Sequence, residues 1–217
     1  MIHDIDQALL TLIRREVPGA SGVEAVLDAP TREWAARRNA PTIDLWLYDL
    51  REDLRRRERG VINAYDDDGL VASRHLPPRY FKLSYLVTAW TQRPEDEHRL
   101  LSEVLDCFLR HDSLPEDVLG GQAAATGLPV VLTIGLPPPE DRGFADVWSA
   151  LGGELRPSLD VVVTVPVDTG QQLPVGPPVS EEPVISLQGD AAERAEQEAE
   201  ARPARGGMRR TRRRAAG

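Results

Sequence analysis

The best candidate for a catalytic or metal-binding cluster is Glu95-Asp96-Glu97-His98, three carboxylates and an imidazole in consecutive positions. Carboxylates and imidazoles serve enzymes as general acids and bases, and carboxylates also bind hard metal ions. The run directly follows Pro94, however, and acidic residues in the first turn of a helix stabilise the helix dipole. Because the apolar stripe of this helix begins only at Leu100, we expect the four side chains to face water.

Two further groups of residues could be catalytic or metal-binding, but neither has the additional residues that such a site requires. Asp66-Asp67-Asp68 precedes Gly69 without the twelve-residue ligand spacing of an EF-hand, so we interpret it as a solvated turn. Cys107 is the only cysteine, and its spacing places neither His98 nor His111 as a base for it, which favours a packing role. The sequence also lacks GxSxG, Walker A, HExxH and GxGxxG motifs. We therefore expect no enzyme and no cofactor, with an enzyme that uses Glu97 and His98 as a minor alternative.

The C-terminal part offers two candidate partner-binding segments. Between Arg202 and Arg214 there are seven arginines and no acid, which could bind nucleic-acid phosphates or an acidic protein face, or could only solubilise the chain end. The apolar island Val184-Ile185-Ser186-Leu187 follows a linker rich in Gly and Pro. It could add a strand to a neighbouring sheet, or it could pack on a neighbouring copy of the chain. The arginines that we single out in the tail are Arg209, Arg210, Arg212, Arg213 and Arg214.

Length and composition favour one domain with an extension. The 217 residues exceed an ordinary domain of about 150 residues, and 41% of them are hydrophobic. A net charge of −9 argues against a general nucleic-acid-binding body, and a single cysteine suits a reducing compartment. We see neither a secretory signal nor an apolar run of the roughly 18 residues that cross a membrane. We expect a domain over residues 1–168 and a linker with an Arg-rich tail over 169–217, extended or disordered for most of its length.

The ordered elements predict an α+β fold with a mixed, mainly antiparallel sheet, helices packed on it, and a flexible C-terminal extension. The first helix, stopped by Pro18-Gly19, has apolar residues at helical spacing, and the strongest helix follows Pro94 and ends near His111. A strand over 42–50 is apolar on both faces, so we expect it to be covered on both sides. The other expected strands cover 23–27, 79–90, 129–134 and 158–165, with a short helix at 144–151.

Four stretches in this order resemble a known family. They are Ile2-His3-Asp4-Ile5-Asp6-Gln7-Ala8-Leu9, the strand from Ile43 to Glu52, the run from Pro77 to Leu101, and Val147 to Leu159. The chain is similar over about residues 2 to 168 to the cap proteins, or tail terminators, of extracellular contractile injection systems of the Photorhabdus virulence cassette and antifeeding prophage type. Asp53 stands where relatives often have Asn.

The resemblance implies a structural role. Such a cap forms a ring, a homohexamer by the resemblance, that ends polymerisation of the inner tube and the sheath and holds the sheath to the tube. Its partners would be further copies of the chain and the sheath and tube proteins, in the bacterial cytoplasm as part of the particle, with no cofactor, membrane or nucleic acid. Two alternatives stay open: a terminator of a true phage or related device, and a small adaptor that binds an acidic protein or nucleic acid through the arginine tail.

Overall fold

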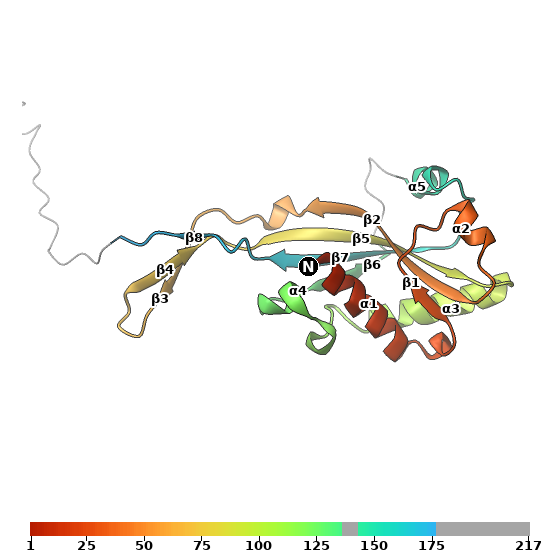
Figure 1. Ribbon diagram of the computed structural model, residues 1–217, viewed down its shortest axis with the longest axis horizontal. Coiled ribbons are helices and arrows are strands. Elements are labelled where there is room, and N and C mark those ends of the chain that lie inside the picture. Colours follow the sequence, from red (N-terminus) through yellow and green to blue (C-terminus); the bar gives the residue numbers. More distant parts are fainter. Residues whose placement is uncertain (136–142, 177–217) are drawn as a thin grey trace, which may run out of the picture. The chain divides into compact units, whose positions relative to one another are not determined.

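A computed structural model describes residues 1–135 and 143–176 of the chain (Figure 1), and these belong to one compact unit, residues 1–176. In chain order the elements are α1 (Ile2–Glu16), η1 (Pro18–Ala20), β1 (Glu24–Val26), α2 (Arg32–Ala36), β2 (Thr42–Glu52), η2 (Leu54–Arg56), β3 (Ile62–Tyr65), β4 (Val71–His75), β5 (Arg79–Trp90), α3 (Pro94–Leu109), η3 (Glu116–Val118), α4 (Gly121–Ala125), β6 (Val131–Ile134), α5 (Phe144–Ala150), β7 (Leu159–Val167) and β8 (Gln172–Leu173). None of the helices described is long and apolar enough to cross a membrane.

The centre of the fold is a five-stranded sheet with the order β1-β2-β5-β7-β6. Every neighbouring pair is antiparallel except β1 and β2, which are parallel. The predicted α+β class and mainly antiparallel sheet are therefore confirmed. The order is not that of the sequence, because β7 comes last of the five along the chain and lies between β5 and β6.

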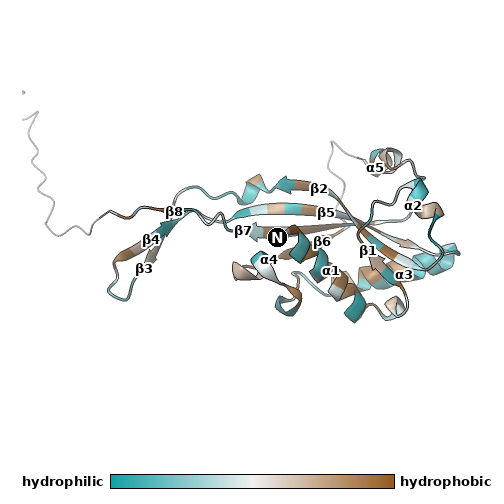
Figure 2. Ribbon diagram, viewed as in Figure 1, coloured by the Kyte–Doolittle hydropathy of each residue, from teal (hydrophilic) through white to brown (hydrophobic). Residues whose placement is uncertain are grey.

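The larger core lies between one face of this sheet and helices α1, α3 and α4 (Figure 1). Helix α1 contributes a stripe of fully buried residues, and Figure 2 shows the alternation of hydrophobic and hydrophilic positions along it. The Tyr85 hydroxyl donates a hydrogen bond of 2.7 Å to Asp6, which fastens α1 to β5. The fully buried side chains of this core include Ile5, Leu9, Leu12, Ile13, Leu45, Leu83, Val104, Phe108 and Val163.

The opposite face of the sheet carries a smaller core under α5. Trp148 of α5 is 1% exposed and packs with Leu86 of β5, and Trp46 and Tyr48 of β2 lie at its edge. The rings of Trp148 and Trp90 are 6.5 Å apart between centroids. The prediction that β2 is covered on both faces is thus confirmed over its first half, where Ile43 and Leu45 face the larger core and Trp46 faces this one.

A second sheet, β3-β4-β8, was not predicted from the sequence. β3 and β4 form an antiparallel hairpin closed by the turn at Asp66–Gly69, and two residues of β8 pair with the far end of β4. Gly69 has φ = 77°, a conformation that glycine adopts at little cost. β8 lies within the segment expected to be a linker, and the bounds of the predicted domain stay a prediction.

Candidate functional site

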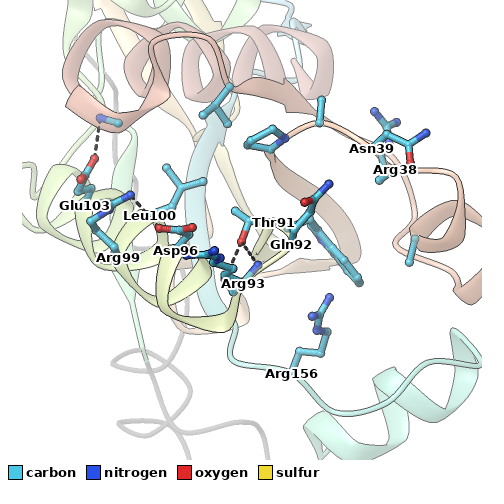
Figure 3. Close-up of a pocket in the computed structure, with 16 residues that line it drawn as sticks. Arg38, Asn39, Thr91, Gln92, Arg93, Asp96, Arg99, Leu100, Glu103 and Arg156 are labelled. Atoms are coloured by element: carbon cyan, nitrogen blue, oxygen red, sulfur yellow. Dashed lines mark hydrogen bonds and ion pairs between the residues drawn. The ribbon is translucent and has the colours of Figure 1, made fainter.

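The described chain has a pocket of about 690 Å³, lined by both charged and apolar side chains, where β5 ends and α3 begins. Figure 3 shows that its charged side chains come from several segments: Arg38 from beyond α2, Arg93 and Asp96 from the start of α3, and Arg156 from the loop before β7. Trp90 supplies an aromatic wall. The lining contains no histidine, cysteine or serine, so the pocket lacks the usual nucleophile and base pairs.

Most charges of the pocket are already engaged with other groups of the protein. Arg38 pairs with Glu24 at 2.9 Å and with Asp28 at 2.8 Å, and its guanidinium lies 4.5 Å from the centre of the Trp34 ring. Arg156 stacks on Trp90 at 4.3 Å. These stacked and paired arginines hold together α2, β5 and the loop before β7. The charged lining of the pocket therefore has a structural role.

The prediction that all four side chains of Glu95-Asp96-Glu97-His98 face water is wrong for Glu97. Glu97 is 8% exposed, accepts hydrogen bonds from Arg156 at 2.9 and 3.2 Å, and accepts one from the Thr91 backbone N–H at 3.3 Å. It shares a helix face with Leu100 and Val104, because residues three and seven positions apart lie on one side of a helix. The carboxylate therefore anchors Arg156, and the cluster does not converge on a catalytic or metal site.

We predict that the pair Glu97–Arg156 is coupled by about 1–2 kcal/mol in the free energy of unfolding, since one partner is buried and the contact is charged on both sides. A double-mutant cycle of Glu97→Gln and Arg156→Met, followed by urea unfolding, measures this value. The matched control is the exposed pair Asp96–Arg99 on the same helix, 3.0 Å apart, for which we expect at most about 0.5 kcal/mol. Equal coupling energies for the two pairs would contradict the anchoring role.

The other candidate groups have structural surroundings. Cys107 is fully buried, and burial raises the pKa of its thiol, which disfavours the nucleophilic thiolate. His111, one of the two histidines considered as a base for this thiol, is 2.8 Å from Glu16. At the hairpin turn Asp66 accepts hydrogen bonds from the N–H groups of Asp68 and Leu70, as a turn aspartate does, so the predicted turn is confirmed. Within the described ranges no three His, Cys, Asp or Glu residues are grouped to hold a metal ion.

The segment after β2 is fixed by Asp53, for which the sequence had suggested no role. Asp53 is 8% exposed, accepts a hydrogen bond from the Arg55 N–H at 3.3 Å, and lies 3.3 Å from the Lys82 ammonium. Its own N–H donates to the Tyr80 carbonyl at 2.8 Å. Because this capping holds η2 on the end of β5, Leu54 is left 66% exposed. The signal available in the sequence was the Asp at the N-cap position before a short helical turn.

The partner-binding residues predicted from the sequence lie outside the described residues. This applies to both segments, Val184, Ile185, Ser186 and Leu187 of the apolar island and Arg209, Arg210, Arg212, Arg213 and Arg214 of the tail. Their roles therefore stay predictions.

Comparison with known proteins finds a family and several similar solved structures. A family described as the Pvc16 N-terminal domain matches residues 4–181. No curated protein sequence matches the chain.

Two of these solved structures are terminating proteins, one of a sheath and tube and one of a tube. The sheath/tube terminator of an extracellular contractile injection system (PVC), in the extended state, is similar with a TM-score of 0.64 and 22% identity, over 96% of this chain and 73% of that one. The tube-terminating cap of the anti-feeding prophage is similar with a TM-score of 0.58 and 22% identity, over 86% of this chain. The similarity spans 62% of that cap, less than two thirds of its length. At this identity the two likenesses show a shared fold.

Proposed function

Because the chain belongs to the Pvc16 N-terminal domain family, we propose that it is the structural cap, or tail terminator, of a phage-tail-like contractile injection particle. The observation that carries the proposal is the match of the family to residues 4–181, supported by the shared fold with the PVC sheath/tube terminator. In this role the protein forms a homohexameric ring on the last layers of tube and sheath, stops their polymerisation, and holds the sheath to the tube. It acts by binding and not by catalysis.

The contacts of such a cap are with proteins. We propose that the body binds further copies of itself and the tube, and that the apolar island Val184–Leu187 adds a strand to a sheath subunit. An added strand would occupy an open sheet edge that otherwise recruits another subunit. The cap then assembles in the bacterial cytoplasm as part of the particle.

The experiment that tests this function is deletion of the gene, followed by electron microscopy of the particles. We expect intact particles to be lost, or tubes and sheaths of scattered length to appear without a blunt end, and the restored gene to reverse the defect. An Ile185→Pro gene should restore tube length but not sheath attachment, because proline cannot donate the strand hydrogen bond. Unchanged particles of uniform length in the deletion strain would contradict the proposed function.

The alternative is a small adaptor that binds an acidic protein or nucleic acid through its arginine tail. The cap and the adaptor differ in their dependence on residues 202–217. Removal of these residues should leave particle length unchanged if the protein is a cap. If it is an adaptor, the same truncation should abolish binding to an acidic partner or nucleic acid, measured as the loss of salt-dependent binding.

A further inference from the structure

The hairpin β3–β4 exposes hydrophobic side chains that nothing else in the described chain covers. Val61, Ile62, Tyr65 and Leu70 are 47%, 38%, 64% and 50% exposed. Ile62 and Tyr65 lie at the two ends of β3, and both are exposed. An isolated hairpin gains little stability by itself, and β8 adds only two residues to it. These exposed side chains indicate a binding surface for another molecule.

The turn of the hairpin adds a concentrated negative charge to this surface. We call residues 65–70, Tyr65-Asp66-Asp67-Asp68-Gly69-Leu70, the acidic tip. All six residues are exposed, and Asp67 and Asp68 make no ion pair with any part of the chain that the structure describes. Figure 2 shows the hydrophilic turn between strands that carry hydrophobic segments. The acidic tip thus combines three carboxylates with the exposed side chains of Tyr65 and Leu70.

A surface of opposite charge lies just before the hairpin. We call residues 54–59, Leu54-Arg55-Arg56-Arg57-Glu58-Arg59, the basic turn, which has four arginines and one glutamate. Arg56 lies over the Tyr80 ring at 5.4 Å, and Arg57 is 3.7 Å from Glu52. Arg55 and Arg59 are exposed and form no ion pair within residues 1–135 and 143–176. Arg56 also lies 3.9 Å from Asp53, so the arginines of the basic turn that are open to a partner are Arg55 and Arg59, beside the exposed side chain of Leu54. The acidic tip presents three negative charges.

The two charged segments of one chain cannot neutralise each other. They flank β3 at opposite ends, and the four residues of a strand span about 13 Å, whereas an ion pair needs about 4 Å. The basic turn of the same copy therefore does not neutralise the acidic tip, whose carboxylates stay available to a partner of opposite charge. A second copy of this chain offers a surface with matching charge and exposed hydrophobic side chains.

We propose that the acidic tip of one copy docks on the basic turn of the next copy, as the repeated contact of the ring. The proposal rests on the proposed function as a ring-forming cap. Tyr65 and Leu70 of the tip pack near Leu54 of the neighbour, and Asp67 and Asp68 pair with its Arg55 and Arg59. Because the two surfaces differ, the contact is head to tail, and its repetition closes a ring when the rotation between copies permits it.

The test uses two charge-reversed full-length variants in the gene-deletion strain. Asp67→Arg with Asp68→Arg makes the tip positive, and Arg55→Glu with Arg59→Glu makes the turn negative. Alone, each variant sets like charges against each other in every contact, so we expect at least about a tenfold loss of uniform-length particles. Expressed together, the variants can alternate around the ring with opposite charges at each contact, so we expect particles to return. All four residues are exposed, and thermal unfolding of the purified variants checks that each is folded.

The outcomes separate this proposal from the proposed function. Normal particles with either variant alone, in a strain whose deletion abolishes them, would overturn the docking and leave the cap function standing. Two inactive variants that do not rescue each other would also overturn the docking, because restoring opposite charges at each contact would then not restore the ring. If the deletion itself leaves the particles unchanged, the cap function fails and the docking fails with it.

Discussion

Replacement of Trp148 by alanine is expected to lower the free energy of unfolding by about 3–5 kcal/mol, which is the usual cost of removing a fully buried large aromatic side chain. Trp148 is 1% exposed and is the largest fully buried residue of the smaller core, where it packs with Leu86 and approaches Trp90. It is carried by a helix of only seven residues, α5, which has few other ways to attach to the sheet. In a protein of this size the melting temperature should fall by roughly 10 °C.

The matched control for this loss is Trp148→Phe. Phenylalanine keeps an aromatic ring in the core, and it removes an indole N–H that has no hydrogen-bond partner among the described residues. We therefore expect Trp148→Phe to lose less than half as much stability as Trp148→Ala. A loss below about 1 kcal/mol for the alanine variant would mean that α5 does not cover this face of the sheet in solution.

The second large effect is expected at Asp44, a carboxyl with no exposed surface in the first half of β2. Burial, with a smaller contribution from the nearby Asp28 carboxylate, raises the pKa of Asp44 to about 8. The folded protein therefore holds this proton at neutral pH, whereas the unfolded chain releases it near pH 3.8. The stability that the wild-type protein owes to the protonated carboxyl is complete below about pH 3.8 and is lost progressively as the pH rises towards 8.

Asp44→Asn removes this titration and keeps the size of the side chain. At pH 7.5 we expect the variant to be more stable than the wild-type protein by about 5 kcal/mol, because this pH lies nearly four units above the pKa of 3.8 in the unfolded chain and each unit is worth about 1.4 kcal/mol. At pH 4 the gain should almost disappear. The measurement is urea unfolding of both proteins at the two pH values, with Asp67→Asn on the exposed hairpin turn as the control. A gain that does not change with pH would contradict the buried, protonated carboxyl.

The parts of the fold that the sequence predicted well are those with a strong hydrophobic pattern. The predicted helix with the apolar stripe from Leu100 to Leu109 corresponds to α3, and the long apolar strand before it corresponds to β5. Each element buries one face, and this burial imposes a regular spacing of apolar residues that the sequence shows directly. The resemblance to the caps of extracellular contractile injection systems agrees with the family that matches residues 4–181. The order of the strands needed the structure, since a pattern of buried faces does not say which strand is the neighbour.

The hairpin β3–β4 escaped prediction for a physical reason. None of the residues of β3 or β4 is fully buried, so no buried face imposes an alternation of apolar and polar residues on Ile62–Tyr65 or Val71–His75. The available signal was the dipeptide Asp68-Gly69 between two short apolar segments, a common hairpin turn. The burial of Glu97 was also not predicted. It depends on the contact with Arg156, a residue 59 positions away in the chain, which the local pattern of residues does not reveal.

The position of β7 in the sheet determines when the five-stranded sheet can be completed during synthesis. β7 supplies the hydrogen-bonding partner of both β5 and β6, although it is the last of the five strands to leave the ribosome. A nascent chain that has not yet released Leu159–Val167 exposes an edge of β5 and leaves β6 without its neighbour in the sheet, a state prone to aggregation and a substrate for chaperones. An interrupted translation product therefore lacks the finished sheet, and quality control can remove it before it is built into an assembly.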